Sequence, residues 1–259
     1  MVLGGGGLTG LAWLSGALEA LPPVLETADE VVATSAGAVL AARMLNGLDG
    51  EGWQAHLAAF AAVRLRVSAV VGLLAAQVWP SRRRALQWLG RRAQHPGPLT
   101  PQGYLEIVQR AIGSTVWPDH LVVVAVDAAA GRPSYFTARS EVPLAAAVAA
   151  SCAVPGVLPP VSIDGRDYID GSLRSPANAH LIADCDRVLV LAPQWRSVRA
   201  SRLPTSQVSR LRAHGAQVVL VQSDLSGLAT LTPSALKAAR QAGRVQGAEV
   251  ADQVERLWA

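Results

Sequence analysis

The pattern of hydrophobic and polar positions changes its period repeatedly along this chain. Short runs rich in β-branched residues predict buried strands, and leucines spaced three or four residues apart predict helices. The predicted strands cover 1–3, 30–33, 121–126, 168–170, 187–191 and 217–221. The predicted helices cover 11–21, 38–45, 143–150 and 233–258. Because strand, loop and helix alternate from the first residues onward, the pattern predicts an α/β fold with a mainly parallel central sheet.

The stretch 51–113 differs from its surroundings. It is mostly helical in pattern, and it contains Trp53, Trp79 and Trp88 together with a cluster of arginines. We expect it to form a helical, cap-like insertion. No internal repeat, low-complexity tract or Pro/Gly-rich linker marks a boundary, so we expect residues 1–259 to form a single domain.

Composition narrows the class of protein. Apolar residues make up 51% of the 259 positions and charged residues 16%, which favours a large core and excludes a disordered chain. The formal charge is +4 and almost all of the positive charge is arginine, with Lys237 as the sole lysine. This mild basic balance permits contact with anionic phosphate surfaces such as lipid headgroups, and we expect no nucleic-acid partner.

Cysteine usage and the N-terminus bear on the compartment. Cys152 and Cys185 form no CxxC or Cys/His pattern, so we expect no structural zinc; free thiols are favoured, and one disulfide stays open. No basic residue precedes an apolar run at the start, which argues against a signal peptide. The most apolar stretch, 67–79, is too short to span a bilayer. We expect a cytoplasmic protein, with peripheral membrane contact as an option.

A serine between a predicted strand and a predicted helix is the first candidate for chemistry. The segment reads Ala33-Thr34-Ser35-Ala36-Gly37. A nucleophile elbow needs small residues two before and two after the serine, because the turn is tight, and Ala33 and Gly37 meet that need. The alternative is that Ser35 only caps the following helix.

A glycine loop follows the first predicted strand. Gly4, Gly5, Gly6 and Gly7 are consecutive, and Gly10 lies in the start of the helix. Glycines let backbone N–H groups approach an anion closely, which suits either an oxyanion hole or a dinucleotide pyrophosphate. The dinucleotide alternative needs an acidic residue at the end of the second strand, whereas Asp29 and Glu30 stand at its start. A tight turn without a ligand is the third interpretation.

A serine nucleophile needs a base, and Asp170 is the candidate. It ends a predicted strand before Gly171, a position where α/β folds place site residues, although Asp-Gly is also a common turn. The histidines have no supporting motif, and a triad with one of them stays open: His56, His95, His120, His180 and His214.

Taken in order, these motifs resemble the patatin-like phospholipase family. The glycine-rich loop, the elbow serine Ser35 and the far downstream Asp170-Gly171 pair match the family's pattern, as does the segment from Ala150 to Pro155 with the sequence ASCAVP. The similarity runs from residue 1 to about 178. Departures are Ala33 for the elbow's first glycine, Ser172 where glycine or alanine is usual, and Thr9 where many relatives carry a basic residue.

The resemblance implies a three-layer α/β/α fold and hydrolysis of lipid acyl esters without a cofactor or metal. It implies a catalytic dyad of Ser35 and Asp170, with an oxyanion hole in the glycine loop Gly4, Gly5, Gly6 and Gly7, centred on Gly5 and Gly6. The substrate would be a lipid or another acyl ester. An esterase or thioesterase on non-phospholipid esters, a non-catalytic patatin-like protein that binds lipid or a partner, and a nucleotide-binding oxidoreductase remain alternatives.

The arginine cluster suggests where a lipid surface would touch. Residues 82–84 and 91–92 are arginines that surround Trp88 on a predicted helix, and the apolar stretch 67–79 precedes it. Arginines beside tryptophan suit a headgroup interface, so one hypothesis is a membrane-contacting cap over about 63–92. The alternative is an ordinary solvated basic helix. The sequence gives no expectation for the oligomeric state.

Overall fold

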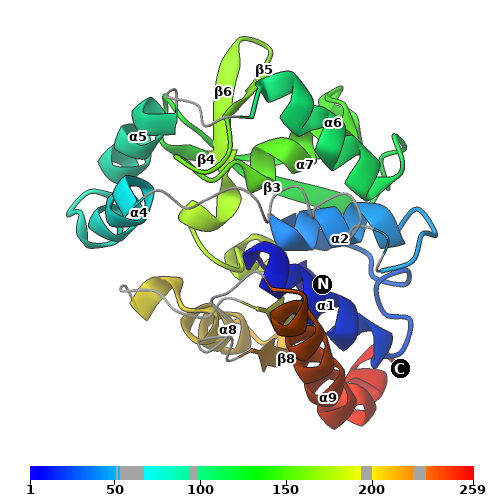
Figure 1. Ribbon diagram of the computed structural model, residues 1–259. Coiled ribbons are helices and arrows are strands. Elements are labelled where there is room, and N and C mark those ends of the chain that lie inside the picture. The colour runs from blue at the N-terminus through cyan, green and yellow to red at the C-terminus, as the bar shows by residue number, and fades with distance from the viewer. Residues whose placement is uncertain (51, 53–66, 94–98, 194–199, 224–231) are drawn as a thin grey trace.

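The computed structural model describes residues 1–50, 52, 67–93, 99–193, 200–223 and 232–259. An eight-stranded sheet forms its centre (Figure 1). The strands are β1 Val2–Leu3, β2 Val31–Thr34, β3 Leu121–Asp127, β4 Arg132–Phe136, β5 Val161–Ile163, β6 Arg166–Asp170, β7 Arg187–Ala192 and β8 Gln217–Gln222. Their order is β5-β6-β3-β2-β1-β7-β8, with β4 also paired to β3. Strands β1, β2, β3, β7 and β8 pair in parallel, whereas β4, β5 and β6 form antiparallel pairs.

Eight α-helices are described. They are α1 Gly7–Glu19, α2 Ala36–Met44, α4 Val67–Val78, α5 Arg82–Ala93, α6 Pro101–Ile112, α7 Leu144–Cys152, α8 Pro204–Ala213 and α9 Pro233–Trp258. Short 3-10 turns occur at η1 Ala138–Ser140, η2 Gly171–Leu173, η3 Ala179–Ile182 and η4 Ala200–Arg202. The predicted elements are present with ends shifted by a few residues. Strands β4 and β5 and helix α8 were not predicted.

Alternate side chains of the central strands build two cores, one on each face of the sheet. In β7, Leu189 and Leu191 join the larger cluster with residues of α1, α2, α6, α7 and α9, whereas Val188 and Val190 join a second cluster with residues of α8 and η3. This follows from the two-residue period of a strand. The predicted three-layer α/β/α fold with a mainly parallel sheet is therefore confirmed.

The stretch 51–113 divides into two parts in the structure, apart from residues 51, 53–66 and 94–98, which lie outside the described residues. Helix α6 belongs to the main core: Tyr104 is fully buried there, and its hydroxyl donates to the carbonyl of Ala149 in α7. Helices α4 and α5 instead pack over β6 and the end of β3 in a third cluster. In Figure 1 they lie to the left of β6, and α6 and α7 lie to its right.

Candidate active site

Two strands of opposite direction meet along one edge of β3. The register pairs Thr34 of β2 with Val124, and Asp170 of β6 with the next residue, Ala125. Because β4 occupies the other edge of β3, the carboxyl ends of β2 and β6 face each other across one residue step. Ser35 directly follows β2, and its Oγ donates a hydrogen bond of 2.9 Å to Oδ2 of Asp170. The fold thus brings the two predicted residues together across 135 positions of sequence.

The backbone at Ser35 has the strained geometry of a tight strand-to-helix turn. Its φ of 52° lies in the left-handed region, which costs a residue other than glycine about 1–3 kcal/mol. Two residues later, a Cβ on Gly37 would stand 2.3 Å from the carbonyl oxygen of Leu3, so only glycine fits. Ala33 is fully buried in β2. Ser35 stands at the N-cap position of α2, but its side chain makes no capping bond to the helix.

A second serine, Ser151, holds the turn at Ser35 in place. The backbone N–H of Ser35 donates to Oγ of Ser151 at 2.8 Å, and the Ser151 hydroxyl donates to the carbonyl of Val124 at 2.6 Å. Ser151 is completely buried at the end of α7. It therefore ties the turn at Ser35 to β3. Sequence reasoning assigned it no role, although it lies in the segment 150–155 that carried part of the family resemblance.

Asp170 is almost fully buried, with 1% of its surface exposed. Removal from water disfavours the carboxylate and raises its pKa from 3.8 to about 6. Hydrogen bonds from the hydroxyl and N–H of Ser172 and from the hydroxyl of Ser35 oppose this shift. The N–H bond from Ser172 to Oδ1 of Asp170 is 2.7 Å long. The result is a carboxylate with a pKa close to neutral, as a general base at neutral pH requires.

Asn178 joins the segment after Asp170 to the end of β2. Its side-chain amide donates to Oγ1 of Thr34 at 3.1 Å and to the carbonyl oxygens of Ser175 and Gly171 at 3.0 and 3.4 Å. The residue is fully buried and adopts a positive φ of 54°. This amide holds the chain on both sides of the Ser35–Asp170 pair. No sequence motif had pointed to it.

The glycine loop packs against Ser35 and Ser172. A Cβ on Gly5 would lie 2.9 Å from Cβ of Ser172 and 3.3 Å from Cβ of Ser35, so this backbone touches both serines. The N–H of Gly4 donates to Leu191 and that of Gly5 to Pro176, at 2.9 and 2.8 Å. These two amides are therefore already bonded to carbonyls.

The dinucleotide interpretation of the loop fails on topology. The glycines follow the carboxyl end of β1, whereas Asp29 and Glu30 precede the amino end of the parallel strand β2. The acidic pair therefore lies at the amino ends of the parallel strands and the glycine loop at their carboxyl ends, so the pair is out of reach of a ligand held by the loop.

A cavity of about 210 Å³ opens above Ser35 and Asp170, and we call it the catalytic cavity. Its floor includes Gly6, Gly7 and Ser172. Helices α4 and α5 supply a largely apolar wall: Leu73, Ala76, Gln77, Arg82, Ala85, Leu86 and Leu89. Val154 and Leu173 complete the lining. Apolar lining beside a few convergent polar groups is the usual form of a site for a small hydrophobic substrate.

No histidine is among the described residues that line the catalytic cavity. His120 precedes β3 and His214 follows α8. His180 lies in η3 and contacts Arg174. His56 and His95 lie outside the described residues. Within the described ranges, then, a carboxylate, that of Asp170, rather than a histidine accepts the hydrogen bond of the Ser35 hydroxyl.

Other sequence expectations concern metals, thiols and membranes. Among the described residues no group of three or more His, Cys, Asp and Glu side chains could hold a metal ion. Cys152 and Cys185 are both free, and burial raises the pKa of each thiol. None of the helices in the described ranges combines the length and the apolar character needed to cross a bilayer.

Comparison with known proteins gives one family and several distant likenesses. The family model described as patatin-like phospholipase matches residues 1–183. The uncharacterized NTE family proteins Mb1092c of Mycobacterium bovis and Rv1063c of Mycobacterium tuberculosis are each 31% identical over 115 residues, which is 43% of this chain. The chain spans only 31% of the length of these relatives.

Two solved structures are similar over nearly the whole chain. The type III effector protein ExoU is 17% identical with a TM-score of 0.42, over 98% of this chain and 52% of its own. VipD from Legionella pneumophila is 14% identical with a TM-score of 0.46, over 96% of this chain and 66% of its own.

Proposed function

This chain belongs to the patatin-like phospholipase family, and from its site we propose that it is a serine acyl hydrolase that cleaves lipid acyl esters through a dyad of Ser35 and Asp170. The hydrogen bond of 2.9 Å between the Ser35 hydroxyl and a buried carboxylate carries the proposal. A strained serine, a base with a pKa near neutral and an adjoining apolar cavity are the parts that acyl transfer needs.

The reaction proceeds in two acyl-transfer steps. Asp170, ionised above its pKa of about 6, accepts the proton of the Ser35 hydroxyl while Oγ attacks the ester carbonyl carbon. The alkoxide leaving group takes that proton and departs as the alcohol. Asp170 then accepts a proton from a water molecule, whose oxygen attacks the acyl-serine. The fatty acid leaves and Ser35 regains its proton.

The oxyanion of each tetrahedral intermediate needs backbone donors, because a lone carboxylate is a weak base. The N–H groups of Gly4 and Gly5 already donate to the carbonyls of Leu191 and Pro176, which leaves Gly6 and Gly7 as the candidate donors of the predicted four. We assign the role to Gly6 and Gly7, since both line the catalytic cavity beside Ser35 and open helix α1, where the helix dipole favours negative charge. Gly5 provides the close approach of the loop to the nucleophile.

The cap over the site carries an exposed apolar stripe. Val71, Leu74 and Val78 of α4 are exposed by 58, 62 and 67%, while Leu73 and Ala76 on the same helix face the catalytic cavity. We propose that α4 contacts the lipid surface from which the acyl chain enters. Three arginines of α5 make contacts within the protein. Arg82 donates to the carbonyl of Leu173, Arg83 donates to the carbonyl of Ala130, and Arg92 stacks on Trp88. Residues 63–66 of the expected cap lie outside the described residues.

Vesicle flotation tests the contact made by α4. Changing Leu74 and Val78 to aspartate is expected to reduce the fraction of protein that floats with phosphatidylglycerol-containing vesicles by several-fold, because burying a charge in the interface is costly. Val116→Asp is the matched control, since Val116 is 65% exposed but lies outside the cap. Equal flotation of all variants would refute the contact.

Labelling of the nucleophile tests the activity. A fluorophosphonate probe is expected to label the wild-type protein, and the protein is expected to hydrolyse a p-nitrophenyl acyl ester; Ser35→Ala should lose both, by at least about 10³-fold in rate, because the covalent step disappears. Ser209→Ala, which changes an exposed serine on α8, is the control. An unlabelled wild-type protein would favour a non-catalytic lipid-binding protein, and full activity in Ser35→Ala would refute the dyad.

A further inference from the structure

The end of helix α7 holds the backbone of both residues of the proposed dyad. The N–H of Ser35 donates to Oγ of Ser151 at 2.8 Å, and the N–H of Asp170 donates to the carbonyl of Ala153 at 2.9 Å. Ser151 lies in the last turn of α7, and Ala153 directly follows the helix. One short segment, 151–153, therefore reaches two residues that stand 135 positions apart in the sequence.

The hydroxyl proton of Ser151 is directed away from Ser35. It is donated to the carbonyl of Val124 in β3 at 2.6 Å, so the hydroxyl oxygen meets the N–H of Ser35 as an acceptor. Ser151 is completely buried, and without its hydroxyl the N–H of Ser35 and the carbonyl of Val124 would lose this partner away from water. The strand register pairs Val124 with Thr34, the residue before Ser35. The hydroxyl therefore joins β3 to β2 at the point where β2 gives way to the turn.

The same carbonyl of Val124 lies close to the backbone that follows Asp170. A Cβ on Gly171 would stand 2.2 Å from this carbonyl oxygen, so glycine is the residue that fits there. The carbonyl that accepts from Ser151 therefore also packs against the residue after the proposed base. Ser151 is thus linked to the surroundings of both ends of the hydrogen bond between nucleophile and base.

The turn at Ser35 needs such a restraint. Its positive φ of 52° is strained, and a strained residue keeps its conformation only where the surrounding structure holds it. Proton transfer from Oγ of Ser35 to Oδ2 of Asp170 acts over 2.9 Å, and a misplacement of about 1 Å can lower a rate by about 100-fold. Ser151 is not among the described residues that line the catalytic cavity, so it acts through Ser35 and not on the substrate.

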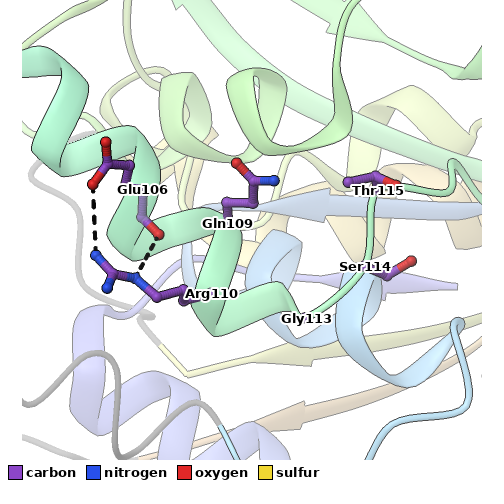
Figure 2. A pocket seen from close by; sticks show the side chains of 6 residues that line it. All are labelled: Glu106, Gln109, Arg110, Gly113, Ser114 and Thr115. Atoms are coloured by element: carbon purple, nitrogen blue, oxygen red, sulfur yellow. Dashed lines mark hydrogen bonds and ion pairs between the residues drawn. The ribbon is translucent and has the colours of Figure 1, made fainter.

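We propose that Ser151 is a positioning residue of the reaction: by accepting from the N–H of Ser35 and donating to Val124, its hydroxyl keeps Oγ of Ser35 within reach of the base. The proposal rests on the proposed acyl hydrolase function and adds a residue to its site. Ser114 supplies a contrast, because its Oγ also accepts from a backbone N–H, that of Val116 at 3.1 Å. It follows α6 and lines a surface pocket away from the catalytic cavity (Figure 2).

The test separates the chemical step from binding, at a temperature well below the melting temperature of each variant. Ser151→Ala is expected to lower kcat/KM for p-nitrophenyl octanoate by about 10- to 100-fold, because the nucleophile loses its restraint. The inhibition constant of p-nitrophenyl octyl ether, which binds but cannot be cleaved, should stay as in the wild type. Ser151→Cys fills a similar space and keeps a weaker donor and acceptor, so its rate should lie between the two. Ser114→Ala is the matched control and should keep the wild-type kcat/KM.

The pH profile separates positioning from a change in the base. The hydroxyl of Ser151 bonds to Ser35 and Val124, so kcat/KM should fall by the same factor at every pH, with the acidic limb still near pH 6. A limb that moves would mean that the substitution acts through the pKa of Asp170, which would overturn the proposal.

The melting temperature separates positioning from stability alone. A lower melting temperature of Ser151→Ala with an unchanged kcat/KM would show that Ser151 only stabilises the fold, and it would overturn the proposal as well. If the alanine variant does not fold, the cysteine variant decides, and a wild-type kcat/KM there would count against positioning. Failure of the dyad itself would appear separately, as hydrolysis retained by Ser35→Ala.

Discussion

The catalytic cavity and a neighbouring pocket of about 290 Å³, which we call the basic pocket, are both lined by Arg82. They differ in the charge of their other lining residues. The catalytic cavity buries one carboxylate among apolar side chains, which raises its pKa to about 6. The basic pocket is lined by four arginines, Arg82, Arg174, Arg202 and Arg210. Burial, then the charges of Arg174 and Arg210, lower the pKa of His180 to about 4. Burial therefore pushes the titratable group of each cavity toward its neutral form, and at His180 the charges of Arg174 and Arg210 act in the same direction.

The short segment 172–175 contributes residues to both cavities. Ser172 gives its N–H and hydroxyl to Asp170, while two residues later the Arg174 side chain points its charge at the neighbouring pocket. At Asp170 burial outweighs these hydrogen bonds and raises the pKa. If Asp170 is the base, substitutions at Asp170 and at its hydrogen-bond partners should change the rate and its pH dependence.

The largest effect is expected from Asp170→Asn. Without a base, kcat/KM for a p-nitrophenyl ester should fall by about 10³-fold or more, and labelling of Ser35 should slow in parallel. Stopped assays on purified protein measure both. A variant with near wild-type turnover would show that another group removes the proton. Asp170 would then not be the base of the catalytic cavity.

The same variant should be more stable than the wild type at pH 8. The neutral form of Asp170 favours folding; this contribution is complete below the unfolded pKa of about 4 and is lost as the pH rises through about 6. Asparagine stays neutral throughout, so its melting temperature should exceed that of the wild type at pH 8 and approach it near pH 4. Thermal unfolding at the two pH values measures the difference, and a variant equally destabilised at both would contradict a burial cost at Asp170.

The local elements and the motif residues could be predicted from the sequence, because each leaves a short-range signal. Ser35 stands between small residues after a β-branched run, and Asp170 ends another strand. Their contact could only be expected through family resemblance, since it depends on β2 and β6 sharing one edge of β3. Strand β5 has three residues, and β4 has a single buried residue, so neither gave a hydrophobic period.

The supporting residues escaped prediction for a related reason. Ser151 bonds to backbone groups of Ser35 and Val124, and Asn178 bonds to the hydroxyl of Thr34, all distant in sequence. A lone polar residue carries no sign of such partners. The basic pocket likewise combines residues of α5, η4 and α8 with Arg174. In the sequence only its α5 member stood in a visible arginine cluster, and that cluster had suggested a membrane face.

The smallest effect, and the sharpest probe of the carboxylate side, is expected from Ser172→Ala. The Ser172 hydroxyl donates to Asp170 and so stabilises its ionised form. Alanine keeps the Cβ that packs near Gly5 but removes this donor, so the pKa of Asp170 should rise. Because catalysis needs the ionised carboxylate, the acidic limb of the kcat/KM profile should start near pH 6 in the wild type and move to higher pH in the variant, with similar rates at pH 9.

Ser209→Ala again serves as the control and should keep the wild-type profile. A limb that stays in place would mean that Ser172 acts on Asp170 through its N–H alone, which alanine retains. A limb that moves to lower pH would contradict the donor role of the hydroxyl. In either case the departure from the family's usual glycine or alanine would need a reason on the other side of the turn, where Arg174 faces the basic pocket.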